Sequence, residues 1–310
     1  MLRLNLLPPV KDGAVRNESI AEQSKEFPMT ATVFIAVVGA AALHAAWNAL
    51  VKGGTDKLMS LTAVILGHVP FAVIAIAVSP PLDLAALPYI AAGVGLHFGY
   101  QVFLLYAYAE GDLTQVYPIA RGSAPLIVAV VSITVLGVSL RPTELIAVFI
   151  IGVGIVSIAL ARRADGLRNR RAAMFALITG CFIASYSMVD GIGARAAGTA
   201  LGYFGWLAIC NSLVLGIAVA IRAPQTYRSL WLEGRGLFWI GGGASFAAYA
   251  IVTWAFTQAP IALVTALRET SIVFALLIGV FFLKERLDLM KVLSTMTVLI
   301  GAALLRLARP

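Results

Sequence analysis

Ten apolar stretches, each about 20 residues long, run through this 310-residue chain and limit the folds that are open to it. A stretch of that length crosses the hydrocarbon core of a bilayer as one helix. Short breaks rich in charge, proline and glycine separate the stretches, and no break is long enough for a soluble domain. The predicted spans are residues 30–51, 58–79, 86–108, 114–137, 143–161, 172–190, 198–221, 237–257, 260–283 and 288–306.

The composition supports a membrane protein and excludes several other classes. With 60% hydrophobic and only 12% charged residues, the chain cannot cover itself with a polar surface. Its two cysteines cannot build a disulfide framework. The net charge of +8 does not predict nucleic-acid binding, because most basic residues lie in short tracts between the apolar runs, as topology signals and lipid-headgroup contacts do. We therefore expect an all-α, multi-pass protein of the plasma or inner membrane.

The order of the predicted spans suggests that the chain contains a duplication. Residues 107–123 align with residues 255–271, and spans and breaks follow the same order in both halves. Because each unit has five helices, an odd number, the second must enter from the opposite side of the membrane, as in many secondary transporters. The predicted segments are a polar, disordered leader at 1–28, a first repeat at 30–161, an arginine-rich loop at 162–171 and a second repeat at 172–308.

Three segments carry a resemblance to a known family. They are HAAWNALVK at 44–52, YPIARGSAP at 117–125 and LKERL at 283–287. The chain resembles the EamA-domain branch of the drug/metabolite transporter superfamily over residues 30–308, although Lys284 replaces the glycine of the family's usual Gly-Glu-Arg pattern. The resemblance implies ten helices, a central cavity and alternating-access transport of small metabolites, often the export of amino acids.

Charged residues inside the predicted spans are the first candidates for function. A charge at mid-bilayer costs about 2.5–3.5 kcal/mol on insertion scales, so such residues usually face the bundle interior and pair there. The repeat alignment makes Arg121 and Glu269 equivalent, so their side chains could meet as a structural ion pair or as an anion-binding arginine with a switchable carboxylate. We assign Arg268 and Glu269 to coupling or gating, together with Asp190, for which the headgroup level is the alternative.

Prolines in the fourth span indicate a kink close to one of these charges. Pro118 and Pro125 flank Arg121, and a proline within a helix removes a backbone hydrogen bond. Freed carbonyl groups at membrane depth need a protein partner or a water-filled cavity. We therefore expect Tyr117 and Arg121, four residues apart on one helical face, to lie beside the substrate cavity, with Pro118 acting in gating.

The first and third predicted spans share a polar and aromatic pattern. In each, a histidine is followed by an aromatic residue at i+3 and a side-chain amide at i+4, which places all three on one helical face. Packing and interface anchoring are the alternatives to cavity lining. The predicted substrate-binding residues on these faces are His44, Trp47 and Asn48 in the first span and His97, Tyr100 and Gln101 in the third, with Tyr249 added from the eighth.

The three histidines, His44, His68 and His97, lie near mid-depth in the first three predicted spans. Imidazoles can bind a metal ion or relay protons. Because these spans contain no acidic residues beside the histidines, we expect no metal site. Proton coupling through His44 or Glu269 and histidines that are simply buried in the core remain alternatives.

These observations predict a secondary transporter that exports a small amphipathic solute, such as an amino acid or a related carboxylate, by alternating access. A carrier for phosphorylated or phosphonate-like anions, bound by Arg121 and Arg268, is the alternative. The chain has no zincin motif, Walker loop or G-x-S-x-G elbow, so we do not expect an enzyme or a cofactor. The expected partners are the solute and membrane lipids, and the expected state is a monomer. The loop charges place both termini away from the cytoplasm, whereas the resemblance implies the reverse.

Overall fold

The computed structural model describes residues 29–52, 56–110, 113–161, 170–281 and 289–307, and in these ranges the chain is helical and contains no strand. This confirms the all-α class. The expected leader at 1–28, most of the loop at 162–171 and the LKERL segment lie outside the described residues.

The helices follow the predicted spans closely. The first half of the chain forms α2 (Ala31–Lys52), α3 (Lys57–Leu66), α4 (His68–Val78), a 3₁₀ turn η1 (Leu84–Ala86), α5 (Leu87–Glu110), α6 (Leu113–Thr134) and α7 (Pro142–Ala161). The second half forms α8 (Arg170–Ala196), α9 (Ala200–Arg222), α10 (Gln225–Glu233), the π-helical η3 (Leu237–Gly241), α11 (Gly242–Gln258), α12 (Ile261–Arg268), α13 (Ser271–Phe281) and α14 (Leu289–Leu307).

Seven helical stretches in the described part of the chain are long and apolar enough to cross a membrane, and shorter apolar helices lie at Ile119–Thr134, Pro142–Gly154 and Thr295–Leu305. The outward-facing side chains are apolar too, since Ile35, Val78, Phe149, Ile221 and Phe281 are each more than 60% exposed. A water-soluble protein rarely presents so much apolar surface. The chain is therefore a multi-pass membrane protein.

The second predicted span, which forms one membrane-crossing stretch at Lys57–Val78, is interrupted at Gly67, where α3 ends and α4 begins. A methyl group at Gly67 would collide with the backbone carbonyl oxygen of Phe238 in η3. From the other side, a methyl group at Gly242 would lie 2.7 Å from the Cα atom of Gly67. Glycine at both positions thus lets two backbones approach closely, as small residues do between membrane helices.

The ninth predicted span is also broken, between α12 and α13. The break is a tight turn in which the backbone N–H groups of Glu269 and Thr270 donate to the carbonyl oxygens of Ala266 and Leu267, each at 3.1 Å. These bonds join residues three apart instead of four, so the turn keeps its polar groups paired inside the protein. All eight residues of α12 are buried, which places this short helix at the centre of the bundle.

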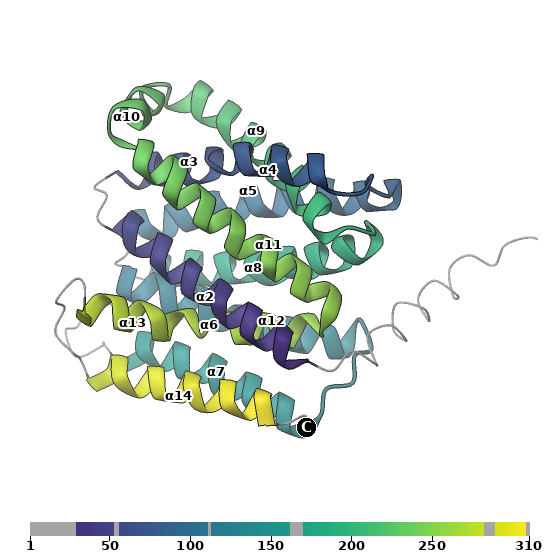
Figure 1. The fold of residues 1–310 in the computed structure, drawn as a ribbon. Helices are drawn as coiled ribbons and strands as arrows, with labels where there is room; N and C mark the ends of the chain where they lie inside the picture. Colours follow the sequence, from purple (N-terminus) through teal and green to yellow (C-terminus); the bar gives the residue numbers. More distant parts are fainter. Residues whose placement is uncertain (1–28, 53–55, 111–112, 162–169, 282–288, 308–310) are drawn as a thin grey trace, which may run out of the picture.

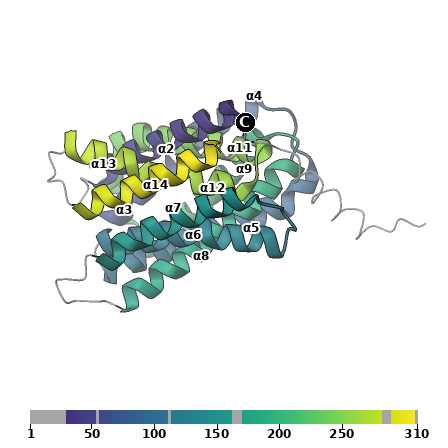
Figure 2. The same ribbon diagram turned by 90° about the horizontal axis from the view of Figure 1, so that it is seen from below.

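The helices pack as long antiparallel or crossing neighbours around this centre (Figure 1). The main pairs are α5 with α8, α6 with both α7 and α8, α7 with α14, α2 with both α11 and α13, and α4 with α9. Figure 2 shows α7, α6 and α8 on one side of the molecule and α13, α14 and α2 on the other. Helices from the two halves of the sequence are therefore interleaved, and a space between them can be lined by both.

Candidate functional site

A cavity lies among nine helices near the centre of the bundle. Its walls combine aliphatic, aromatic and polar side chains, and two arginines reach it. The lining residues are Ala40, Ala41, His44 and Trp47 of α2; Leu61, Val64 and Ile65 of α3; His68 of α4; His97, Tyr100 and Gln101 of α5; Arg121 of α6; Tyr186 of α8; Phe204, Leu207, Ala208 and Asn211 of α9; Ser245, Ala248, Tyr249 and Val252 of α11; and Arg268 of α12.

Most of the residues singled out in the sequence lie at this cavity. The structure places eight of them in its lining: His44, Trp47, His97, Tyr100, Gln101, Arg121, Tyr249 and Arg268. Asn48 lies outside that lining, and its amide donates to the backbone oxygen of His44 at 2.7 Å. Tyr117 and Pro118 belong to α6, but their side chains are outside the described part of the structure.

Arg121 and Glu269 meet across the bundle. Arg121 Nη2 lies 2.9 Å from Glu269 Oε1, and its Nε donates to Oε2 at 3.1 Å. Both side chains are buried, with exposed fractions of 8% and 3%. A two-point arginine–carboxylate contact is directional and strong, because the planar guanidinium fits both oxygens. The pair joins α6 to the turn between α12 and α13.

Arg268, the neighbour of Glu269, has different surroundings. It is the last residue of α12, it is 7% exposed, and its guanidinium carbon lies 5.2 Å from the centre of the Tyr249 ring. Its Nη1 atom is buried and has no hydrogen-bond partner among the described residues. Burying a charged N–H group without a hydrogen-bond acceptor raises the free energy of the folded protein. The tight turn gives these two consecutive residues different partners. The Glu269 side chain pairs with Arg121 on α6, whereas the Arg268 side chain lines the cavity.

Other lining residues also carry polar atoms that find no partner in the described part of the chain. Most buried polar atoms in proteins are hydrogen-bonded, so several orphans around one cavity indicate groups that bind something else. Unpartnered polar atoms therefore gather on the residues that line this cavity, which makes the cavity the candidate binding site. These atoms are Trp47 Nε1, His68 Nε2, Gln101 Oε1 and Asn211 Oδ1, in addition to Arg268 Nη1.

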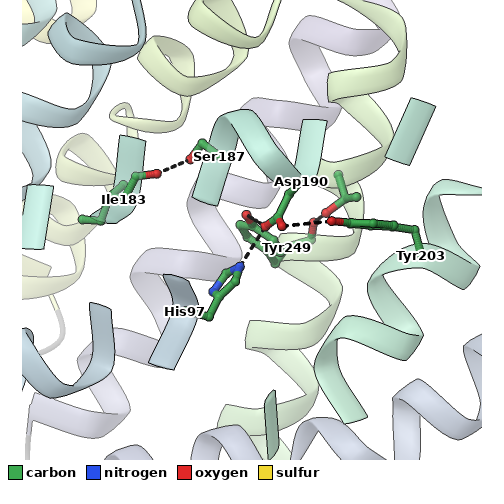
Figure 3. A network of polar contacts seen from close by, with 7 residues as sticks. His97, Ile183, Ser187, Asp190, Tyr203 and Tyr249 are labelled. Carbon is green, nitrogen blue, oxygen red and sulfur yellow. Dashed lines mark hydrogen bonds and ion pairs between the residues drawn. The ribbon is translucent and has the colours of Figure 1, made fainter. Parts of the chain in front are cut away.

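A second polar cluster lies behind one wall of the cavity and centres on Asp190 of α8, whose side chain is fully buried (Figure 3). Its Oδ2 accepts from Tyr249 at 2.6 Å and lies 2.8 Å from His97 Nε2, and its Oδ1 accepts from Tyr203 at 3.3 Å. Gly93 on α5 leaves room for the carboxylate, since a methyl group there would lie 2.9 Å from Oδ1. Asp190 is therefore held inside the bundle, away from the molecular surface.

Aromatic rings connect this cluster with the cavity. The Tyr186 ring stacks on His97 with centroids 4.1 Å apart, and the Phe204 ring lies 5.0 Å from that of Tyr249. Three polar or aromatic residues of α9 were not among those predicted from the sequence: Phe204, Tyr203 and Asn211. Asn211 is the one that a search for amide side chains within apolar spans could have found. The two aromatic residues gave no such signal, because aromatic side chains are common throughout membrane helices.

Comparisons with known proteins agree with a membrane transporter. Residues 207–310, the last third of the chain, match the family model described as "Magnesium transporter NIPA". No curated protein matches the chain. A solved structure described as "Crystal structure of protein" is 18% identical, covers 89% of this chain and 99% of its own, and superposes with a TM-score of 0.69. At this identity the likeness concerns the fold, and the family match indicates the transporter class.

Proposed function

We propose that this protein is a secondary transporter that binds a small amphipathic carboxylate, such as an amino acid, in the central cavity and moves it by alternating access. The observation that carries the proposal is the buried, unpartnered Nη1 of Arg268 in an aromatic-lined cavity. A carboxylate is the natural partner for a guanidinium, and it would supply the acceptor that the protein does not.

Arg268 is the better anchor of the two cavity arginines. Arg121 already holds Glu269 at two points, so a solute anion there would have to displace a buried carboxylate. Arg268 Nη1 can donate a hydrogen bond to a solute without breaking a hydrogen bond within the protein. This proposal moves the anion-binding role from Arg121, the anchor predicted from the sequence, to the other arginine of the cavity.

The rest of the lining supports a solute with an apolar part. Trp47, Tyr186 and Phe204 offer ring faces and edges for a hydrocarbon or aromatic group. The amide oxygens of Gln101 and Asn211 are unpartnered acceptors, which suits the ammonium group of an amino acid. A strongly charged phosphate ester would need more cations and fewer rings, so the phosphorylated-anion alternative fits less well.

Magnesium transport, suggested by the name of the matching family model, fits the cavity less well than a carboxylate does. Mg²⁺ is bound by oxygen ligands, usually carboxylates and water. The cavity instead receives two guanidinium groups, and the carboxylates of Asp190 and Glu269 are engaged by His97, two tyrosines and Arg121. Within the described residues no group of three or more His, Cys, Asp or Glu side chains could hold a metal ion.

Helix packing supports an inverted repeat of two five-helix units as the transport framework. If α2 corresponds to α8, and so on in order, the contact between α5 and α8 maps onto that between α11 and α2. The contact of α6 with α8 likewise maps onto that of α12 and α13 with α2. The α4–α9 and α7–α14 contacts map onto themselves. A two-fold arrangement of ten spans predicts this pattern, and rocking of one repeat against the other would open the cavity to either side.

The proposal can be tested by ligand-induced thermal stabilisation of the purified protein. The probes are L-phenylalanine, 3-phenylpropionate, the uncharged 3-phenylpropan-1-ol and MgCl₂. A ligand at 100 times its Kd stabilises the native state by about 2.7 kcal/mol. We expect both carboxylates to raise the Tm, and the alcohol and Mg²⁺ to have little effect.

Matched arginine variants locate the anchor. Arg268→Gln should remain folded and lose the shift caused by 3-phenylpropionate, whereas Arg235→Gln, at an exposed arginine of the α10–η3 region, should keep it. Equal stabilisation by the carboxylate and the alcohol, or an undiminished shift in Arg268→Gln, would refute the carboxylate site. Stabilisation by Mg²⁺ alone would favour a cation transporter instead.

A further inference from the structure

We propose that His97 and Asp190 form a proton-binding site that couples protonation to the binding of an anionic solute. The inference rests on the proposed function, because the coupling acts on the solute in the same cavity. It differs from the sequence-based candidates for coupling, His44 and Glu269, and the geometry of the Asp190 cluster carries it.

The cluster contains a fully buried carboxylate with no arginine or lysine bonded to it in the described structure. Two tyrosine hydroxyls, of Tyr203 and Tyr249, donate to its oxygens, and tyrosine hydroxyls add no positive charge. The third contact is His97 Nε2 at 2.8 Å, the one contact of the three that can change its charge near neutral pH. With a neutral imidazole the pair carries a charge of −1, and with an imidazolium it carries none.

A proton has a direct route to this pair from the cavity. His97 lines the cavity and its side chain is 14% exposed, whereas Asp190 behind it is fully buried. The Nε2 atom faces the carboxylate, and no described residue is hydrogen-bonded to the other ring nitrogen, Nδ1 (Figure 3). A proton from cavity water can therefore bind at Nδ1 while the Nε2–H donates to Asp190 throughout. The charge of the pair changes without any bond in the cluster being broken.

Few other groups around the pair can change charge in the same range. Tyr186 on α8, Tyr203 on α9 and Tyr249 on α11 are phenols, a group whose ordinary pKa of about 10 keeps it neutral in this range. The guanidinium groups of Arg121 on α6 and Arg268 on α12 stay charged. This leaves His44 on α2, His68 on α4 and the Glu269 carboxyl that pairs with Arg121 as the competing proton sites.

Tyr249 connects the proton site to the solute site. Its hydroxyl donates to Asp190, and the face of its ring lies against the guanidinium of Arg268. An anion on Arg268 is repelled by a pair of charge −1 in this poorly solvated interior and is not repelled by a neutral pair. Proton uptake therefore strengthens anion binding, and by reciprocity anion binding promotes proton uptake. A transporter of this kind carries the proton together with the anion.

Isothermal titration calorimetry of the full-length protein with 3-phenylpropionate tests the coupling. Binding heats in phosphate and in Tris at one pH give the number of protons taken up, because the two buffers release protons with different enthalpies. We expect net proton uptake by the wild type, and a Kd that rises with pH by up to about tenfold per unit. The solute remains a carboxylate between about pH 6 and 8, so its own titration does not interfere.

Variants of the pair should shift affinity in opposite directions. Asp190→Asn removes the fixed negative charge, so between about pH 7 and 8 it should bind as tightly as the wild type does at low pH, without proton uptake. His97→Gln keeps an N–H donor for Asp190 but cannot gain a charge, so it should bind weakly at every pH. His44→Gln removes a competing histidine of the cavity wall; whatever its affinity for the anion, the number of protons taken up per bound anion should stay that of the wild type.

A second measurement assigns the proton to a particular histidine. The protein has three histidines, so ¹⁵N-histidine NMR with single variants resolves each imidazole. His97 should gain a proton when the anion binds in the wild type, and should not do so in Asp190→Asn. If it stays neutral, or if His44→Gln rather than the Asp190 and His97 variants abolishes proton uptake, the proposal is overturned. Failure of 3-phenylpropionate to bind at any pH would instead refute the proposed function, and an NMR pH titration of the protein alone would still decide whether the proton site exists.

Discussion

Removal of Glu269 should destabilise the protein more than removal of Arg121, although the two side chains form one ion pair. Their two contacts, at 2.9 and 3.1 Å, lie in a buried environment. Loss of one partner of a buried pair costs about 3–5 kcal/mol, because the remaining charge is left without compensation. We expect the loss in free energy of unfolding to lie at or above the upper end of this range for Glu269→Gln and near its lower end for Arg121→Gln.

The asymmetry comes from Arg268, whose charge also acts on Glu269. In Arg121→Gln, the carboxylate keeps this second cation nearby. In Glu269→Gln, two buried guanidinium groups remain and the carboxylate on which both act is gone. The repulsion between like charges then adds to the lost pairing.

Equilibrium unfolding in denaturant, in a fixed detergent, measures the free energies of unfolding of both variants. Arg235→Gln is the control: its guanidinium is exposed and lies 4.1 Å from the Trp231 ring, so it should cost no more than about 1 kcal/mol. The reasoning is refuted if Glu269→Gln unfolds within about 1 kcal/mol of the wild type, or if Arg121→Gln is the more costly change.

Two further predictions concern packing and the Asp190 cluster. Gly67→Ala should lower the free energy of unfolding by about 1–3 kcal/mol, because the added methyl group meets the backbone of η3. Gly39→Ala is the control, since its methyl group enters open space and should change the stability little. Thermal unfolding compares the two variants. Tyr249→Phe removes a 2.6 Å hydrogen bond to Asp190 and should lower the free energy of unfolding by about 1.5–3 kcal/mol. Tyr203→Phe removes a longer bond, of 3.3 Å, and should lower it less. Equal losses in chemical unfolding would contradict this ranking.

Hydropathy alone located the helices well. The predicted span at 143–161 became Pro142–Ala161, and the one at 30–51 became Ala31–Lys52. A span in lipid must be apolar over most of its length and must satisfy its backbone internally, so its position is a local property of the sequence. The break at Gly67 was missed, although Pro70 has no N–H to donate to the carbonyl oxygen of Leu66 and so interrupts the helix locally. What the sequence could not show is the close approach of the η3 backbone to Gly67.

Helical periodicity also predicted which residues share a face. His97, Tyr100 and Gln101 lie together on α5 and line the cavity, and His44 and Trp47 do so on α2. The same pattern placed Asn48 with them, but its amide bonds to its own helix backbone. Spacing gives the angle between two side chains on one helix but leaves open how that helix is rotated against its neighbours.

The sequence by itself determined an all-helical membrane protein and the buried charges that it had to accommodate. Only the tertiary structure decided how those charges are partnered. Arg121 and Arg268 look alike in sequence, yet one is held by Glu269 and the other has an unpartnered nitrogen at the cavity. Asp190 contacts His97, which lies on another helix and 93 residues earlier in the sequence. The length of an apolar stretch is a property of consecutive residues, whereas the pairing of buried polar groups depends on which helices pack together and how each is rotated about its axis.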